Sequence, residues 1–364
     1  MNSLGFNKAE KHTKVVVAMS GGVDSSVAAV MLKKEGYEVI GITLKLYNNS
    51  NVSKSKSCCA GIDIQDAKKV ALDNNFQHIV LDYQAKFFDG VINNFVDSYS
   101  NGETPLPCVK CNETVKFSDL LNEAKKIGAD ALVTGHYAIR KGTINNSSLH
   151  KAKDFSKDQS FFLFATSQEQ LDYVRFPLGN FKKSEIRQLA QQYKLDVSNK
   201  PDSQDICFVT SDSYRDLVKN LNPGVNKKGL IYDTKNNILG THSGISNFTI
   251  GQRKGIGVSG SKQALYVIEI NKIQNSITLG KKEKLKKNII NFKNINWLGG
   301  SIFPKKLDCS AKIRSTQEDL PGILDIQSDY GTFTFTSSID GTSPGQACVF
   351  YKNDQLLGGG WITA

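Results

Sequence analysis

One stretch decides the fold: Val15-Val-Val-Ala-Met-Ser-Gly-Gly-Val-Asp-Ser-Ser26. Residues 15–18 are apolar and mostly β-branched, which predicts a short buried strand. Residues 27–34 carry apolar side chains at helical spacing, so a Gly-rich turn joins a strand to a helix. Such a turn presents backbone N–H groups and a helix N-terminus to an anion. The stretch therefore predicts a phosphate-binding loop.

The turn lacks the Gly-Lys-Ser/Thr of a Walker loop. Ser20-Gly-Gly-Val-Asp-Ser25 instead resembles the PP-loop of ATP pyrophosphatases. Those enzymes cleave ATP between its α and β phosphates and adenylate a carbonyl oxygen. The complete hexapeptide, between a strand and a helix, favours this interpretation over an ordinary Gly-rich turn.

Composition limits the class of protein. The chain has 364 residues, enough for two or three domains, and 39% of them are hydrophobic. Its net charge of +11 favours a polyanionic partner such as nucleic acid, although a generally basic proteome would give the same charge. No apolar stretch is long enough to span a bilayer, and residues 1–14 resemble neither a signal nor an import peptide. We therefore expect a cytoplasmic protein with no membrane partner.

Strand and helix signals alternate over residues 15–140, which predicts an α/β domain with a parallel sheet and helices on both faces. The expected strands are 15–18, 37–46, 78–82 and 131–134, and the expected helices are 27–34, 64–74 and 118–127. Ligands bind at the carboxyl ends of such strands, so the PP-loop, Leu44 and residues 134–136 should converge. Residues 161–200 read as helical, mainly over 167–173 and 183–193.

The character of the chain changes after Phe208, where short β-like runs alternate with turn signals. These runs predict a small mixed central domain followed by a C-terminal β-barrel, with a sandwich as the alternative. We expect the domains to cover residues 1–208, 209–282 and 283–364.

Seven cysteines in a long chain of this kind argue for catalysis, metal binding or burial rather than a disulfide scaffold. Cys108-Val-Lys-Cys111 follows two prolines that predict an extended or loop segment. The pair fits a redox couple, half of a zinc site or iron–sulfur ligands, and the second pair that zinc would need is absent. Cys207 is a third candidate. Cys309 and Cys348 lie in apolar β-like runs and should be buried, whereas Cys58 and Cys59 are ambiguous.

Nine segments, in register over nearly the whole chain, make it resemble the tRNA-specific 2-thiouridylases, the MnmA/TrmU family. They are residues 18–26, 104–112 with 115–117, 134–137, 157–160, 200–208, 249–255, 311–314, 344–346 and 356–360. The resemblance implies ATP-dependent 2-thiolation of the wobble uridine of tRNA. It assigns ATP binding to Ala18, Met19, Ser20, Gly21, Gly22, Val23, Asp24, Ser25, Leu44 and Gly135.

The resemblance also implies the chemistry. Uridine O2 is adenylated with the help of Mg²⁺, for which Asp24 would be a ligand or an orienting group. Sulfur carried on Cys207 as a persulfide attacks C2, and Cys111 completes its release through a Cys111–Cys207 disulfide. The sulfur would come from a donor such as a cysteine desulfurase or a sulfur-relay protein.

The implied tRNA partner is the anticodon stem-loop of Lys-, Glu- and Gln-type tRNAs. The target base, which must leave the stack to react at C2, would lie against Leu106, Pro107 and Cys108. Further tRNA contacts are implied for His136, Lys157, Asp158, Gln159, Arg314, Ser315 and Gln346.

Two positions depart from the family pattern. Leu106 stands where family members usually have Asn, which removes a polar contact to the base. Cys108 stands where some members have Asp. This opens a second mechanism, in which Cys108, Cys111 and Cys207 hold an iron–sulfur cluster that binds the incoming sulfide. Persulfide relay and cluster chemistry use the same residues, and both remain open at this stage.

Two other classes of function would explain only part of the sequence. A PP-loop synthetase acting on a small metabolite, such as an argininosuccinate synthetase-like enzyme, would not need Cys111 and Cys207. A noncatalytic tRNA-binding module would need neither the cysteines nor an intact PP-loop. The sequence therefore favours the enzyme.

Overall fold

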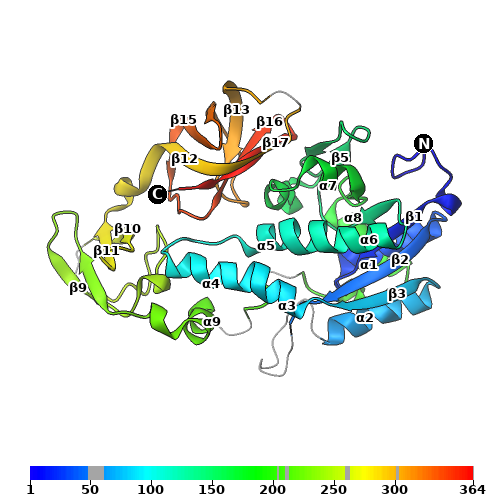
Figure 1. The fold of residues 1–364 in the computed structure, drawn as a ribbon, viewed down its shortest axis with the longest axis horizontal. Coiled ribbons are helices and arrows are strands. Elements are labelled where there is room, and N and C mark those ends of the chain that lie inside the picture. The colour runs from blue at the N-terminus through cyan, green and yellow to red at the C-terminus, as the bar shows by residue number, and fades with distance from the viewer. Residues whose placement is uncertain (48–60, 203–204, 210–212, 259–262, 301–302, 364) are drawn as a thin grey trace.

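The computed structural model describes residues 1–47, 61–202, 205–209, 213–258, 263–300 and 303–363. The fold contains three sheets. Figure 1 shows the C-terminal sheet above the helices of residues 93–110, which lie between two strands of the N-terminal sheet in the chain. Cys58 and Cys59 lie outside the described residues. Within the described part of the chain, no helix is long and apolar enough to cross a membrane.

The N-terminal sheet has five strands in the order β3-β2-β1-β4-β7, and every pairing is parallel. The strands are β1 (Lys14–Ala18), β2 (Glu38–Lys45), β3 (Gln77–Asp82), β4 (Ala131–Val133) and β7 (Val174–Arg175). The parallel sheet predicted from the sequence is thereby confirmed. The edge strand β7 was not predicted, because two residues are too short to show a periodic pattern.

Helices cover both faces of this sheet, as the apolar alternation along β1 requires. Val15 and Val17 face a core shared with α1 (Val23–Lys34), α2 (Gly61–Asp73) and α8 (Lys183–Gln192). Val16 faces the opposite core, to which the helical segments between β3 and β4 contribute. Those segments include α3 (Gln84–Phe87), α4 (Asn93–Ser100), α5 (Pro107–Lys110) and α6 (Leu121–Lys126). Burial on both faces explains why the central strands β1 and β4 are almost wholly apolar.

The Cys108–Cys111 motif lies in a helix and not in the extended segment that the prolines predicted. α5 begins at Pro107, continues as a π-helical stretch over Cys111–Leu120 and ends in α6. Proline is tolerated at a first helical position because its missing N–H would have no partner there. The helix predicted for 118–127 therefore starts eleven residues earlier.

The region after β4 is less helical than predicted. α7 (Gln168–Tyr173) and α8 agree closely with the predicted helices, but β7 and short 3₁₀ turns occupy much of the rest. A hairpin of β5 (Ile139–Lys141) and β6 (Ser148–His150) was also not foreseen.

The second sheet has the order β10-β11-β8-β9 and its own small apolar core. Its strands are β8 (Gly229–Tyr232), β9 (Ile238–His242), β10 (Tyr266–Asn271) and β11 (Ser276–Gly280), preceded by α9 (Tyr214–Leu221). The β8–β11 pair is parallel and the other two pairs are antiparallel. α9 packs against α4, which joins this region to the N-terminal domain.

The third sheet is a closed, six-stranded antiparallel barrel, so the barrel is confirmed over the sandwich. Its strands are β12 (Lys286–Trp297), β13 (Lys306–Lys312), β14 (Leu320–Gln327), β15 (Tyr330–Asp340), β16 (Ala347–Lys352) and β17 (Gln355–Ile362). Pairing between β12 and β17 closes the ring. The rings of Phe292 and Phe333 both contact Phe350 inside it, at centroid distances of 5.0 and 6.2 Å.

The barrel shares a sheet with the N-terminal domain. Strand β6 pairs with the start of β17, where Leu149 lies opposite Leu356 and His150 opposite Gln355. The hairpin β5–β6 thus extends the barrel wall with strands from the first domain.

The barrel core gives a stability prediction. Cys348 is fully buried, as expected, whereas Cys309 is only partly buried. Cys348→Ser places a hydroxyl in an apolar interior and should lower the free energy of unfolding by about 1–3 kcal/mol. Cys309→Ser should cost less than half as much in the same urea titration. Equal effects of the two substitutions would contradict this description of the core.

Candidate active site

The predicted phosphate loop joins β1 to α1 and is shaped by Gly21. Its φ is +71°, and a Cβ at this position would lie 2.1 Å from the carbonyl oxygen of Asp63, so only glycine fits. The amide of Ser20 donates to Ser25 Oγ over 3.1 Å. No side chain caps the N-terminus of α1. Its N–H groups and partial positive charge therefore face the loop, as an anion site requires.

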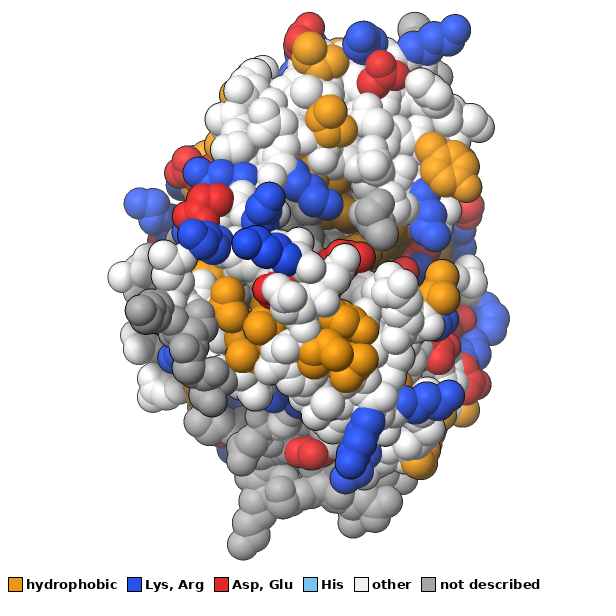
Figure 2. Space-filling model, turned by 90° about the vertical axis from the view of Figure 1, so that its left-hand side faces the viewer, with side chains coloured by type: hydrophobic (Ala, Val, Ile, Leu, Met, Phe, Trp, Pro, Cys, Tyr) orange, Lys and Arg blue, Asp and Glu red, His pale blue; other side chains and the backbone are white. Residues whose placement is uncertain are grey.

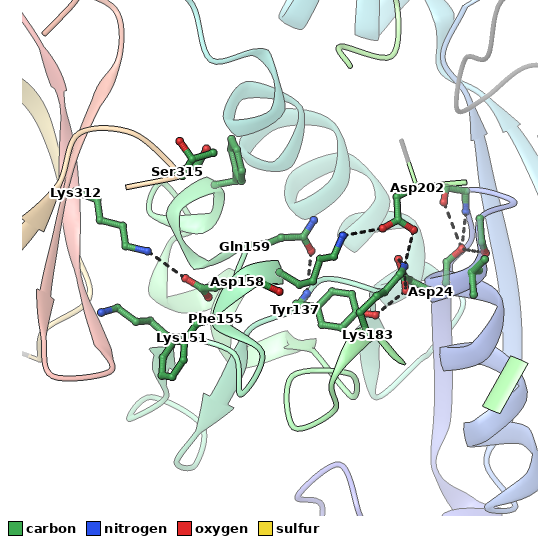
Figure 3. A pocket seen from close by; sticks show the side chains of 18 of the residues that line it. Asp24, Tyr137, Lys151, Phe155, Asp158, Gln159, Lys183, Asp202, Lys312 and Ser315 are labelled. Carbon is green, nitrogen blue, oxygen red and sulfur yellow. Dashed lines mark hydrogen bonds and ion pairs between the residues drawn. The ribbon is translucent and has the colours of Figure 1, made fainter. Parts of the chain in front are cut away.

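A lysine from another part of the chain neutralises the acidic residue of the loop. Lys183 Nζ lies 2.7 Å from both carboxylate oxygens of Asp24 and 2.9 Å from Asp202. The hydroxyl of Tyr137 donates to Asp24 over 2.7 Å. Burial, followed by the charge of Asp24, raises the pKa of Tyr137, so its phenol stays protonated as a donor. Figure 3 shows these four side chains meeting at one end of the site.

A second lysine holds the loop backbone. Lys200 Nζ donates to the carbonyl of Gly21 over 3.0 Å and pairs with Asp63 and Asp66 at 2.5 and 2.6 Å. Burial alone would lower the pKa of Lys200, but the two carboxylates outweigh it and raise the pKa. The other carboxylate oxygen of Asp63 is buried and has no hydrogen-bond partner among the described residues. This orphan oxygen belongs to a residue that lines the cavity described next.

A cavity of about 1050 Å³ runs from the PP-loop to the barrel (Figure 3). Its size suits a nucleotide. The lining combines loop residues with charged side chains from both domains: Ser20, Gly22, Val23, Asp24, Ser25, Asp63, Tyr137, Lys151, Lys157, Asp158, Gln159, Lys183, Lys200, Asp202, Lys312, Ser315 and Asp319, among others.

The residues expected to bind ATP fall into two groups. Those that line the cavity are Ser20, Gly22, Val23, Asp24 and Ser25. The others support the loop from behind. Met19 and Leu44 are buried, Ala18 ends β1, and Gly135 packs so closely that a Cβ would lie 2.9 Å from Ser25 N.

The three candidate cysteines lie apart from this cavity. Cys108 is exposed, Cys111 is buried and Cys207 is partly buried, and no disulfide joins them. Cys111 and Cys207 both contact the apolar core between the sheet and its helices. Burial raises the pKa of the Cys111 thiol, which the charge of Lys116 partly offsets. None of the three lines the nucleotide cavity.

The cysteines also do not fit an iron–sulfur cluster as they are placed. Among the described residues, no group of three or more His, Cys, Asp or Glu side chains is arranged to hold a metal ion. A cluster needs several thiolates around one centre.

The residues expected near the target base begin the cysteine helix. Leu106 precedes it and is partly buried, and Pro107 is buried at its first position. Gln346, from the barrel, donates through Nε2 to the carbonyl of Thr104 over 3.0 Å. The loop before β16 therefore lies against the segment that leads to the cysteines.

The remaining residues expected to contact tRNA have different surroundings. Lys157 pairs with Asp202 at 2.9 Å, and Gln159 accepts from the amide of Tyr137. Ser315 lines the cavity, while Arg314 donates to the carbonyl of Gly341 over 2.6 Å. Asp158 is turned inward, with its side chain only 2% exposed.

His136 lies among aromatic rings. Its imidazole meets Phe117 and Phe176 edge-on at centroid distances of 6.0 and 6.3 Å, and Nδ1 contacts Thr134 Oγ1. Burial, reinforced by the charge of Lys116, lowers the pKa of His136 to about 3. The ring is therefore neutral at physiological pH and brings no positive charge to a phosphate.

Sequence reasoning missed Lys183, Asp63 and the roles of Tyr137, Lys200 and Asp202. The segments that carry the family resemblance include Tyr137, Lys200 and Asp202, and this is the sequence feature that could have identified them. Lys183 shows only as the start of a predicted helix, which has no local signature of phosphate chemistry.

Comparison with family models matches three consecutive regions. Residues 13–211 match a tRNA methyl transferase HUP domain, 218–281 a tRNA methyl transferase PRC-barrel domain and 287–362 an aminomethyltransferase beta-barrel domain. A protein of Ehrlichia ruminantium named tRNA-specific 2-thiouridylase MnmA is 51% identical over 98% of this chain and 96% of its own length. One of Rhodospirillum centenum with the same name is 47% identical over 100% of this chain and 94% of its own.

Among solved structures, the U34-tRNA thiolase NcsA of Methanococcus maripaludis aligns with 62% of this chain and 70% of its own, at 16% identity and a TM-score of 0.37. The sheet, the phosphate loop and the cavity define an ATP-using α/β enzyme of the PP-loop class. With near-full-length relatives at about half identity, the chain belongs to the tRNA-specific 2-thiouridylase (MnmA) family.

The lysine between the two carboxylates gives the first prediction for this site. Lys183→Met leaves Asp24 and Asp202 facing the incoming phosphates without their shared cation. The dissociation constant of a non-hydrolysable ATP analogue should rise at least about tenfold by calorimetry. Lys182→Met is the matched control, since its side chain is the exposed neighbour. Near-wild-type affinity in Lys183→Met would contradict the nucleotide assignment of the cavity.

The depressed pKa of His136 gives a pH prediction. In the unfolded chain this histidine titrates near 6.5, so the unfolded state binds an extra proton as the pH falls below that value. The stability from neutral His136 is present above pH 6.5 and is lost as the pH falls toward 3. Between pH 7 and 5, wild type should lose about 2 kcal/mol more unfolding free energy than His136→Asn. Parallel pH profiles of the two proteins in urea titrations would rule this out.

Proposed function

We propose that this chain converts the wobble uridine of tRNA to 2-thiouridine by adenylation and sulfur transfer. The observation that carries the proposal is the cavity between the uncapped N-terminus of α1 and the barrel, with Lys183 held at Asp24. The family to which the chain belongs supports the same reaction.

In the first step, O2 of the uridine attacks the α-phosphorus of ATP and pyrophosphate leaves. The N–H groups of the PP-loop and α1 bind the phosphate oxygens, and Lys183 and Lys200 balance their charge. Transfer of Lys183 from Asp24 to a phosphate costs little, because both partners are anionic. Mg²⁺ would neutralise the leaving pyrophosphate, and the orphan oxygen of Asp63, with Asp24, fits a cation that arrives with the nucleotide.

In the second step, the terminal sulfur of a Cys207 persulfide attacks C2 and AMP leaves with the former O2. Cys111 then attacks the sulfur of Cys207, which breaks the S–S bond to the transferred sulfur and forms a Cys111–Cys207 disulfide. A thiol reductant restores the two cysteines, and a cysteine desulfurase or relay protein reloads Cys207. Burial raises the pKa of Cys111, and we expect tRNA binding to open this region before the thiol loses its proton.

The substrate we propose is the anticodon stem-loop of Lys-, Glu- and Gln-type tRNAs. The net charge of +11 suits a polyanion. Figure 2 shows Lys and Arg side chains gathered across the middle of one face of the molecule, above a group of hydrophobic side chains. In this proposal, the domain of residues 1–208 catalyses the reaction, and the domains of residues 209–282 and 283–364 bind the tRNA.

The cysteine substitutions test this function. Cys111→Ser and Cys207→Ser should each abolish 2-thiouridine, measured by mass spectrometry of tRNA nucleosides, because serine cannot carry sulfane sulfur. Both variants should still release pyrophosphate in the presence of tRNA, since adenylation uses the other site. Cys309→Ser, remote in the barrel, is the control and should retain activity.

Cys108 separates the two sulfur mechanisms. In the persulfide relay it borders the base, so Cys108→Ser should keep at least about a tenth of wild-type thiolation. Loss of activity together with loss of bound iron, measured on anaerobically purified protein, would instead support the cluster. Wild-type protein that forms no 2-thiouridine with ATP, Mg²⁺ and a sulfur donor would overturn the proposed function.

A further inference from the structure

The contact between the N-terminal domain and the barrel centres on Tyr351. This residue of β16 is fully buried, and its hydroxyl lies 3.1 Å from Ser160 Oγ of the first domain. Two ammonium groups approach its ring, Lys151 at 4.7 Å and Lys312 at 5.6 Å from the centroid. One lysine comes from each domain, so the ring is a shared cation–π acceptor.

Each lysine also pairs with a carboxylate of the opposite domain. Lys151, from the first domain, pairs with Asp319 of the barrel, and Lys312, from the barrel, pairs with Asp158 of the first domain at 3.7 Å. The lysine side chains are only 9% and 10% exposed. Figure 3 shows Lys312 reaching across to Asp158 at the barrel end of the cavity. Separating the domains would leave buried charges without partners, which is costly.

Both carboxylate oxygens of Asp158 have partners within the protein. Its carboxylate accepts from the amides of Ala152 and Ser160 at 3.0 and 3.2 Å and from Ser160 Oγ at 2.8 Å, besides the contact with Lys312. Asp319 is similarly occupied. Burial opposes its ionisation, but hydrogen bonds from Lys151 and Ser310 outweigh this and lower its pKa.

We propose that the crossed ion pairs Asp158–Lys312 and Lys151–Asp319 are positioning elements that orient the barrel on the catalytic domain. Ser315 lies three residues after Lys312 and borders the nucleotide cavity, so the orientation of the barrel decides where this loop stands. Asp158 thus acts through Lys312 instead of touching tRNA, contrary to the expectation from the sequence. The backbone pairing of β6 with β17 keeps the barrel attached, and the ion pairs set its angle.

The expected effect of the ion pairs on tRNA binding rests on the proposed function, whereas their effect on the orientation of the barrel does not. The test compares Asp158→Asn, Lys312→Met and the double variant with wild type. Each single substitution should weaken tRNA binding at least tenfold. The double variant should be no more than about threefold weaker than either single one, because the second change removes a partner already lost. Lys312→Arg should restore most of the affinity.

A matched control lies on the same strand. Lys306 of β13 pairs with Asp325 within the barrel at 3.7 Å, and both are exposed. Lys306→Met and Asp325→Asn should change tRNA affinity less than twofold. The affinity of these two control variants for an ATP analogue should also change less than twofold, since neither residue lines the nucleotide cavity.

Small-angle X-ray scattering supplies a readout that does not depend on tRNA. The interface variants should show a larger radius of gyration than wild type, and the controls should not. Unchanged scattering, or tRNA effects that add fully in the double variant, would overturn the inference. Wild type that fails to bind tRNA would count against the proposed function, and scattering would still decide the docking. Where Asp158→Asn does not fold, Lys151→Met and Asp319→Asn take its place.

Discussion

The ammonium group of Lys183, held between Asp24 and Asp202, is the contact on which the site depends. It brings together three segments that are distant in sequence: the PP-loop, the start of α8 and the stretch that leads to Cys207. The side chain of Lys183 is buried and pairs with both carboxylates, and Asp202 also pairs with Lys157 and Arg187. Both carboxylates thus already have cationic partners, and we expect a nucleotide to exchange partners with them.

The distance along the chain between interacting residues explains which parts of the site could be predicted from the sequence. The PP-loop was predictable because its glycines and the strand–turn–helix context are local properties, and Gly21 meets a steric limit set by Asp63. Lys183 and Asp63 were not, because their partners lie far away along the chain. Asp158 shows a different limit, since the motif drew attention to the residue but carries no information on its burial, and its side chain is almost fully buried.

The same distinction between local and long-range interactions decides which elements of the fold could be predicted. The parallel sheet follows from apolar strands that alternate with helices, so its main strands were predicted within one or two residues. Closure of the barrel depends on the pairing of β12 with β17, which no local pattern encodes. The helix that contains Cys108 was not predicted, because the prolines were interpreted as marking an extended or loop segment. Proline is compatible with a helix at its first position, where Pro107 lies. Strands β5, β6 and β7 are too short for periodicity to appear.

The pairing of β6 with β17 also bears on how the chain folds. Leu149 meets Leu356 across an interval of about two hundred residues, so this contact forms only after the last strand has left the ribosome. Until then, the hairpin presents an unpaired edge next to a domain that is otherwise complete. Long-range closure of this kind is slow, because the entropy of ordering the chain is lost before the contact is gained. During synthesis this edge is therefore exposed to pairing with another chain.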